Sequence, residues 1–118
     1  RRRGPHSNRS EAARARADQA GADYERTVLT ALREASDALT GVRASRDQVV
    51  AEQTRATSLR RAFELAELRY RSGISSYLEV LDAQRSLFDA ELSLTRAELR
   101  QLIAAVQLYK ALGGAWQP

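Results

Sequence analysis

Between Pro5 and Pro118 the chain contains no proline, and this constrains its fold more than any other sequence feature. Proline ends or kinks an α-helix because it lacks a backbone N–H and its ring clashes with the preceding turn. The stretch is rich in Ala, Arg, Leu and Glu, and aromatic residues make up only 6% of the chain. Such a composition, with apolar residues three and four positions apart, is typical of long helices and coiled coils. We therefore expect an all-α protein.

The helical pattern is interrupted once, at the sequence SGISS over residues 72–76. Gly73 can supply the positive φ or the close backbone approach that a tight turn between helices requires. We expect a long helix over residues 9–71, a turn over 72–76 and a returning helix over 77–112. Together they would form a long antiparallel helical hairpin of the coiled-coil type. Residues 1–8 are expected to be irregular, and residues 113–118 to form a short tail.

The ends of both helices carry local signals. Asn8 or Ser10 is suited to cap the first helix with its side-chain oxygen. The Gly113-Gly114 pair is suited to stop the second helix. Gly41 is the second-best break point, but a single glycine costs a helix only about 1 kcal/mol relative to alanine.

Apolar stripes follow both helices. In the second helix one stripe keeps a three-four spacing without a slip, which is the pattern of a coiled-coil seam. A shorter stripe lies beside it, so this helix is expected to bury more than one side. The seam consists of Leu78, Leu81, Arg85, Phe88, Leu92, Thr95, Leu99, Leu102, Val106 and Tyr109, and the second stripe of Leu87, Leu94, Gln101, Ala105 and Leu108.

The first helix is much longer than the second, so a hairpin leaves part of it without a partner. The overhang, about residues 9–35, still carries Tyr24, Val28 and Leu32. A long helix with an apolar stripe needs tertiary contacts to be stable. The sequence therefore predicts assembly with another chain, or with parts of a longer protein that this chain lacks.

The sequence lacks the residues that are characteristic of several functional classes. Without cysteine the sequence offers no disulfide or thiolate metal site, and the single histidine, His6, has no second ligand nearby. We find no phosphate-binding loop and no nucleophile–base arrangement, so we expect no enzyme activity, no cofactor and no metal. No apolar run approaches the roughly 20 residues of a membrane-spanning helix. Charges of both signs are mixed along the chain, which argues against a nucleic-acid partner.

The region around the break resembles a known family. Its features are Arg69-Tyr70, Gly73, Tyr77-Leu78, the run LDAQR over residues 81–85 and the ending LYKALGG over residues 108–114, followed by Trp116. Over roughly residues 12–116 the chain is similar to the TolC-like outer membrane efflux proteins, in particular their OprM-like lipoprotein branch.

The resemblance implies a fold and a function. Members are homotrimers in which a β-barrel crosses the outer membrane and an α-helical tube extends into the periplasm. This chain resembles the C-terminal α-helical part of the second repeat, without the barrel. The implied function is passive export of drugs or toxic compounds in a tripartite system. The implied partners are a periplasmic adaptor and an inner-membrane pump, and the implied location is the outer membrane with this segment in the periplasm.

The resemblance also implies two sets of site residues. The tip turn would dock the adaptor through Arg71, Ser72, Gly73, Ile74 and Ser75. A gate or selectivity ring at the tube entrance would involve Tyr70, Glu79, Asp82 and Arg85, with Asp82 the principal carboxylate. The alternative for Glu79 and Asp82 is a pair of solvated surface carboxylates, with Arg85 as their partner. Arg85 occupies a seam position, where a charged residue more often fixes the register of the helices than takes part in catalysis.

A second reading of the sequence stays open. A stand-alone helical hairpin that serves as an interaction or oligomerisation module would show the same stripes and the same turn. An α-helical nucleic-acid binder is a third possibility, motivated only by the arginine content.

Overall fold

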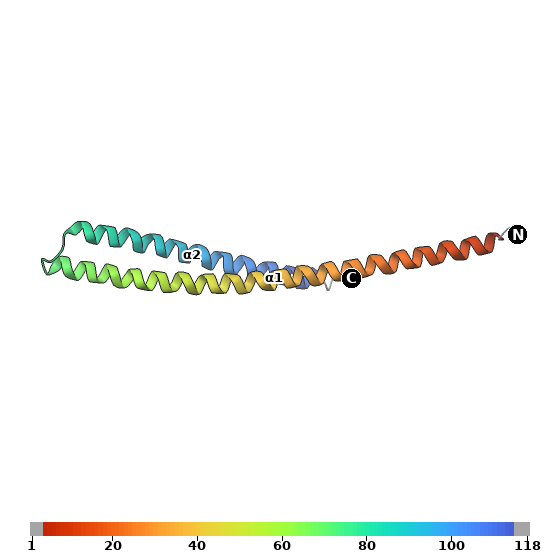
Figure 1. Cartoon of the computed structure of the whole chain (residues 1–118), viewed down its shortest axis with the longest axis horizontal. Coiled ribbons are helices and arrows are strands. Elements are labelled where there is room, and N and C mark those ends of the chain that lie inside the picture. Colours follow the sequence, from red (N-terminus) through yellow and green to blue (C-terminus); the bar gives the residue numbers. More distant parts are fainter. Residues whose placement is uncertain (1–3, 115–118) are drawn as a thin grey trace.

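The computed structural model describes residues 4–114 and shows two α-helices that run side by side in opposite directions (Figure 1). Helix α1 spans Pro5–Arg71 and helix α2 spans Tyr77–Gly114, with lengths of 67 and 38 residues. The molecule measures 106 × 24 × 14 Å, so it is one helix thick in its shortest dimension. This confirms the all-α fold with a long antiparallel hairpin.

The N-terminal end differs from the sequence prediction. Residues 5–8 were expected to be irregular, but α1 begins at Pro5 and neither Asn8 nor Ser10 is its cap. Gly4 is extended, with φ −67° and ψ 160°, and its carbonyl accepts a 3.0 Å hydrogen bond from the Ser7 amide. Proline is favourable at the first helical position because its φ is already helical and its missing N–H has no partner there. Pro5 therefore starts the helix.

The turn between the helices is built from backbone hydrogen bonds. Gly73 has φ +76°, and its amide donates to the Tyr70 carbonyl at 3.0 Å. The Ile74 amide donates to the Arg69 carbonyl at 2.8 Å. This pair of bonds, with glycine in the left-handed conformation, is a Schellman motif, which satisfies the last carbonyls of α1. The chain then reverses, and α2 begins at Tyr77.

The C-terminal end also differs from the prediction. Helix α2 was expected to stop at Leu112, with Gly113 and Gly114 as its cap, but both glycines lie inside the helix. Gly41 does not break α1 either, and no atom lies within 4 Å of the place where its Cβ would be. Continued hydrogen bonding of the backbone outweighs the modest entropic cost of these glycines. The expected tail, residues 115–118, lies outside the described residues.

Small side chains form most of the contact between the helices. Ala90 and Ala97 of α2 are 0% and 1% exposed, and Ala56 and Ala66 are buried on α1. Small residues let two helix backbones approach closely, because the spacing of packed helices depends on the side chains at the contact. On each helix these positions recur in heptads, and the remaining buried residues are Val42, Val49, Val80 and Leu87.

The seam of large residues on α2 does not face α1. Phe88 is 64% exposed, Leu102 is 66% exposed and Tyr109 is 80% exposed. This heptad position lies about 160° round the helix from Ala90 and Ala97 and about 100° from Val80 and Leu87. Helix α2 therefore has two apolar faces, a buried inner face of Ala, Val and Leu87 and an exposed outer face of mostly larger residues.

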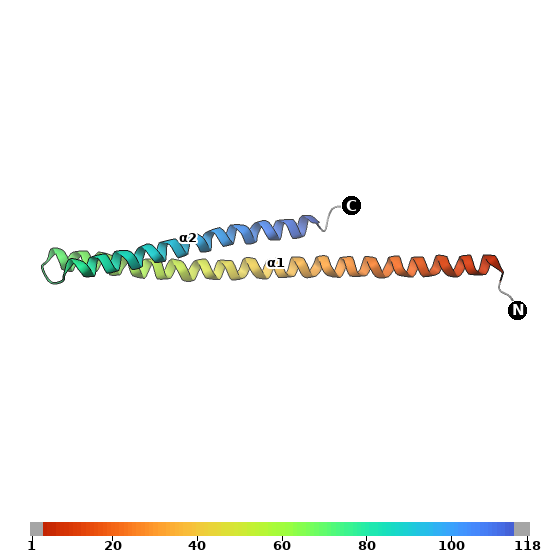
Figure 2. The same ribbon diagram turned by 90° about the horizontal axis from the view of Figure 1, so that it is seen from above.

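The N-terminal third of α1 extends beyond the end of α2. Figures 1 and 2 show this overhang as a single helix with no neighbour, and Figure 2 shows that the two helices diverge before α2 ends. Tyr24 in the overhang is 72% exposed, and Leu32 near its base is also exposed. In the described part of the chain, neither helix contains a stretch apolar enough to cross a membrane.

We predict that Gly73→Ala lowers the free energy of unfolding by about 1 kcal/mol, because an alanine side chain disfavours a positive φ. No atom lies within 4 Å of the added Cβ, so the cost comes from the backbone alone. Gly41→Ala is the matched control, since it is equally unobstructed but helical, and it should stabilise the protein by up to about 1 kcal/mol. Urea unfolding followed by circular dichroism measures both. Equal effects of the same sign would contradict the prediction.

Candidate functional site

The five residues expected to dock a partner form the end of the molecule opposite the N-terminus (Figure 1). The side chains of Arg71, Ser72 and Ile74 are exposed, and Gly73 lies between the last two. Ser75 is partly buried, and its Oγ is buried without a hydrogen-bond partner among the described residues. The turn's backbone bonds hold its shape, so most of its side chains are free to contact another molecule.

Two tyrosines brace the base of this turn. The rings of Tyr70, at the end of α1, and Tyr77, at the start of α2, lie 5.2 Å apart with an interplanar angle of 55°. Such tilted aromatic pairs are favourable. Both rings line one shallow groove, together with Phe63, Glu67, Arg71, Val80 and Gln84. Tyr77 was absent from the expected site residues, although one tyrosine on each side of the break was visible in the sequence.

Three of the candidate gate residues, Glu79, Asp82 and Arg85, lie on the first three turns of α2 and form surface ion pairs. The fourth, Tyr70, lies near the end of α1. Arg85 donates to the Asp82 carboxylate at 3.1 Å, and both side chains are more than half exposed. Glu79 lies 3.9 Å from the Nε of Arg69, which comes from α1. Exposed pairs of this kind contribute between about 0 and 1 kcal/mol. In the single chain, Asp82 and Arg85 are therefore the solvated pair that the alternative interpretation anticipated.

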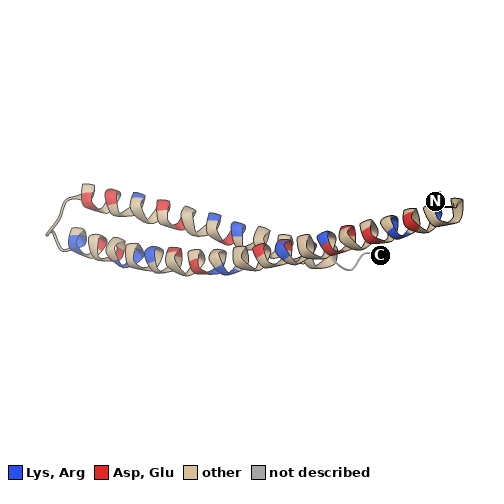
Figure 3. Ribbon diagram, turned by 45° about the vertical axis from the view of Figure 1, so that its right-hand side comes forward, with Lys and Arg blue, Asp and Glu red and all other residues tan. Residues whose placement is uncertain are grey.

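Charges of both signs alternate along the two helices (Figure 3). Among the described residues, two ion pairs cross the hairpin, one between Arg60 and Glu91 and one between Arg69 and Glu79. Others join neighbouring turns of one helix, as Arg26 does with Asp23. A nucleic-acid-binding surface would instead gather basic residues on one side. Within the described residues, no cluster of three or more His, Cys, Asp or Glu could hold a metal ion.

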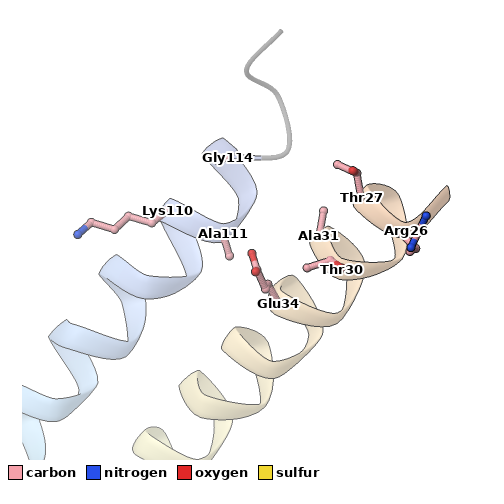
Figure 4. Close-up of a pocket in the computed structure, with 8 residues that line it drawn as sticks. All are labelled: Arg26, Thr27, Thr30, Ala31, Glu34, Lys110, Ala111 and Gly114. Carbon is pink, nitrogen blue, oxygen red and sulfur yellow. The ribbon is translucent and has the colours of Figure 1, made fainter. Parts of the chain in front are cut away.

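A cleft opens where the helices diverge, at the end of α2. Figure 4 shows Glu34 and Ala111 between the two helices, whereas the Lys110 side chain extends away from α1. Thr27 also lines the cleft, and its hydroxyl donates to the Asp23 carbonyl of its own helix at 2.9 Å. We interpret the cleft as the place where hairpin packing ends.

The features of the site lie along the whole hairpin rather than in one enclosed pocket. Helix α2 has apolar residues on two opposite faces, and the hairpin carries a rigid turn at one end and a bare helix at the other. A helix with two opposite apolar faces fits between two neighbouring helices in a layer. This geometry defines the chain as part of a larger helical assembly.

Comparison with known proteins identifies the family. Residues 2–114 match the family model of the outer membrane efflux proteins. The toluene efflux pump outer membrane protein TtgC of Pseudomonas putida is 45% identical over 95 residues, which are 80% of this chain and 20% of TtgC. The outer membrane protein OprJ of Pseudomonas aeruginosa is 43% identical over 104 residues, 88% of this chain and 22% of OprJ.

A solved structure supports the same family. The outer-membrane channel OprN superposes with a TM-score of 0.69 at 36% identity, over 95% of this chain and 25% of the OprN chain. The chain therefore belongs to the outer membrane efflux protein family, which confirms the resemblance seen in the sequence. The family match begins at residue 2, earlier than the expected residue 12. The chain spans about a fifth of the length of the curated relatives it matches.

Proposed function

We propose that this chain is the second-repeat helical hairpin of the outer-membrane channel of a tripartite efflux system. The observation that carries the proposal is the pair of opposite apolar faces on α2. One face is buried against α1, and the other needs a second neighbour. A wall of such helices that closes into a tube leaves no apolar edge exposed.

The proposal places the hairpin in the periplasm, with its tip turned towards the inner membrane. The complete channel would be a homotrimer anchored in the outer membrane, working with a periplasmic adaptor and an inner-membrane pump. The tube would be a passive path for small organic compounds, a class to which the toluene in the name of the similar TtgC belongs. The unpartnered overhang of α1 supports this reading, because Tyr24 and Leu32 would pack on other helices of the tube.

In this proposal the turn at residues 71–75 docks the adaptor. Ile74 is 70% exposed at the end of a rigid turn, and a large exposed apolar side chain there is suited to burial against a partner. Gly73 leaves open space beside it, since nothing lies within 4 Å of its Cβ position. The turn therefore offers an apolar side chain next to a gap that a partner helix can enter.

The same proposal places the gate just inside the tip. Tyr70, Glu79, Asp82 and Arg85 lie within about three helical turns of the break, so three-fold symmetry would repeat them around the tube entrance. Converging carboxylates attract cations and disfavour anions. Because the pair of Asp82 and Arg85 is exposed and weak, Asp82 can turn from Arg85 towards the lumen at little cost.

A chimera tests the function. In the chimera, residues 5–114 of this chain replace the matching segment of TtgC. We expect this chimera to restore toluene tolerance to a strain that lacks TtgC. The physical reason is that each surface of the hairpin would find its partner in the chimera. The inner and outer faces would pack on neighbouring helices, and the turn would contact the adaptor. A second chimera with Ala90→Leu and Ala97→Leu, which overfill the inner face, is the matched control and should fail. If the first chimera is folded and inserted in the membrane but the strain stays sensitive to toluene, the proposal is overturned.

The docking assignment is tested by Ile74→Asp in the same chimera. An exposed charge does not disturb the hairpin, but it must lose its hydration if a partner buries it. We expect at least a tenfold fall in crosslinking to the adaptor, with unchanged trimer assembly. Ser58→Asp, on an exposed position of α1 away from the tip, serves as the control. Equal crosslinking for Ile74→Asp and the parent would remove the tip from the docking surface.

The gate assignment is tested by Asp82→Asn. Removing three converging charges should lower the preference for cations and weaken block by trivalent cations, with little change in fold. Asp89→Asn is the positional control, since Asp89 has the same heptad position one repeat farther from the tip and should have a smaller effect. Reversal potentials and block are read from single channels in planar bilayers. Identical values for Asp82→Asn and the parent would leave Asp82 an ordinary surface charge.

A further inference from the structure

A groove runs between the two helices beside the C-terminal half of α2. Its volume is about 400 Å³, and its lining includes Gly41, Ala97, Arg100 and Gln107. Most of the lining side chains are small or apolar, and Ala97 is almost fully buried. On the α1 side Gly41 leaves the rim open, because no atom lies within 4 Å of the place where its Cβ would be. The groove is therefore of a size and shape to accept the apolar body of a small molecule.

One charged residue, Arg100, lines this groove. Its side chain is exposed and forms no ion pair with any described residue. The side-chain amide of Gln107, one heptad farther along α2, likewise has no hydrogen-bond partner among the described residues, whereas the Gln48 amide on the opposite rim donates to Glu52 at 3.0 Å. A guanidinium group with free donors can bind a carboxylate through two parallel hydrogen bonds. The groove thus combines an apolar lining with one free cation.

A second arginine strengthens the positive charge beside the groove. Arg96 precedes Arg100 by one turn on the same face of α2, and it too has no ion-pair partner among the described residues. Glu98 lies about 200° round the helix from both arginines. On α1, the Glu52 carboxylate already accepts a hydrogen bond from Arg55 at 3.3 Å. Two arginines one turn apart repel each other, and a bound anion would reduce this repulsion.

The groove lies on the side of the hairpin that carries the candidate gate. Arg100 follows Glu79 by three heptads, and Gln48 precedes Arg69 by three heptads. Arg69 and Glu79 meet across the hairpin at 3.9 Å, and Gln48 and Arg100 line the same groove, so both pairs lie along one edge of the contact between α1 and α2. Asp82 lies one turn beyond Glu79 at this edge. If the gate faces the lumen of a tube, the groove opens into the same lumen.

We propose that this groove binds organic anions with an apolar body, in particular aromatic carboxylates. Arg100 holds the carboxylate, and the apolar lining between Gly41 and Ala97 contacts the ring. The position of the groove in a channel lumen rests on the proposed function, whereas the binding itself needs only the hairpin. An open site gives weak binding, with a dissociation constant on the order of 1 mM for a ligand of about 13 non-hydrogen atoms. Weak binding suits a transport path, because a compound must leave the site as well as enter it.

A matched pair of small molecules tests the chemistry of the groove. Naphthoate carries a carboxylate, and naphthamide has nearly the same shape without the charge. Each is titrated into the full chain, and binding is followed through the backbone amide signal of Gly41 by nuclear magnetic resonance. We expect naphthoate to bind at least about threefold more tightly than naphthamide, because only the carboxylate pairs with Arg100. Equal dissociation constants for the two compounds, or no shift of the Gly41 signal, would overturn the proposal.

Two variants separate the charge of the groove from its shape. Arg100→Gln should weaken naphthoate binding at least about threefold and leave naphthamide binding unchanged, whereas Gly41→Leu fills the open rim and should weaken both. Arg46→Gln is the matched control, because Arg46 is exposed and lies two residues before Gln48, about 200° round α1 and so away from the groove. If Arg46→Gln weakens naphthoate as much as Arg100→Gln does, the attraction is a general one between opposite charges, and the groove is rejected as the site.

Single channels formed by the chimera with TtgC test where the groove opens. Naphthoate added on the periplasmic side should lower the conductance, and Arg100→Gln in the chimera should reduce this effect at least about threefold. If the full chain binds naphthoate but the conductance of the chimera is unchanged, the groove does not open into the lumen, and that part of the proposal is wrong. If the full chain binds naphthoate but the chimera fails to restore toluene tolerance, the binding site stands and the proposed function alone is overturned.

Discussion

The packing of small side chains between α1 and α2 is the contact on which the rest of the structure depends. Ala90 and Ala97 are almost fully buried, and the alanines of α1 that face the hairpin contact are equally small. Because small residues occupy the inner face, the large residues of α2 project from the opposite side. The hairpin is only 14 Å thick in its shortest dimension, and Leu87 is the one leucine among its buried residues. The large apolar groups on the outer face can be buried only by a neighbour.

At the tip, the groups that fix the conformation of the turn differ from the side chains that are available to contact a partner. Its shape depends on backbone bonds made by the amides of Gly73 and Ile74 and on the rings of Tyr70 and Tyr77. The side chains of Ser72 and Ile74 contribute to none of these contacts. Substitutions there can change a partner without changing the turn. The nearby carboxylates of Glu79 and Asp82 form only exposed pairs, so rearranging them costs little.

The sequence was sufficient for the fold class and the position of the break, because a chain without proline between Pro5 and Pro118 and with one glycine-containing interruption has few alternatives. It was sufficient for the family because the motifs around the break are specific. It was insufficient to decide which stripe of α2 meets α1. Heptad spacing identifies stripes, but the partner of a stripe depends on the matching small residues of α1, some forty positions away. Residues 5–8 were expected to be irregular, although a proline such as Pro5 can also start a helix. Tyr77 was missed because its role depends on contact with Tyr70 across the turn.

The allocation of small residues to the inner face and large residues to the outer face matches the entropic cost of forming each contact. The inner contact joins two helices of one chain through a short turn, and closing a short loop costs little entropy. The outer contact joins separate helices or chains, which lose translational and rotational freedom on binding. A contact with a low entropic cost can form with alanine and valine, whereas one with a high cost requires leucine, phenylalanine and tyrosine. The hairpin is therefore suited to form first, with its outer face ready for whichever helix comes to lie against it.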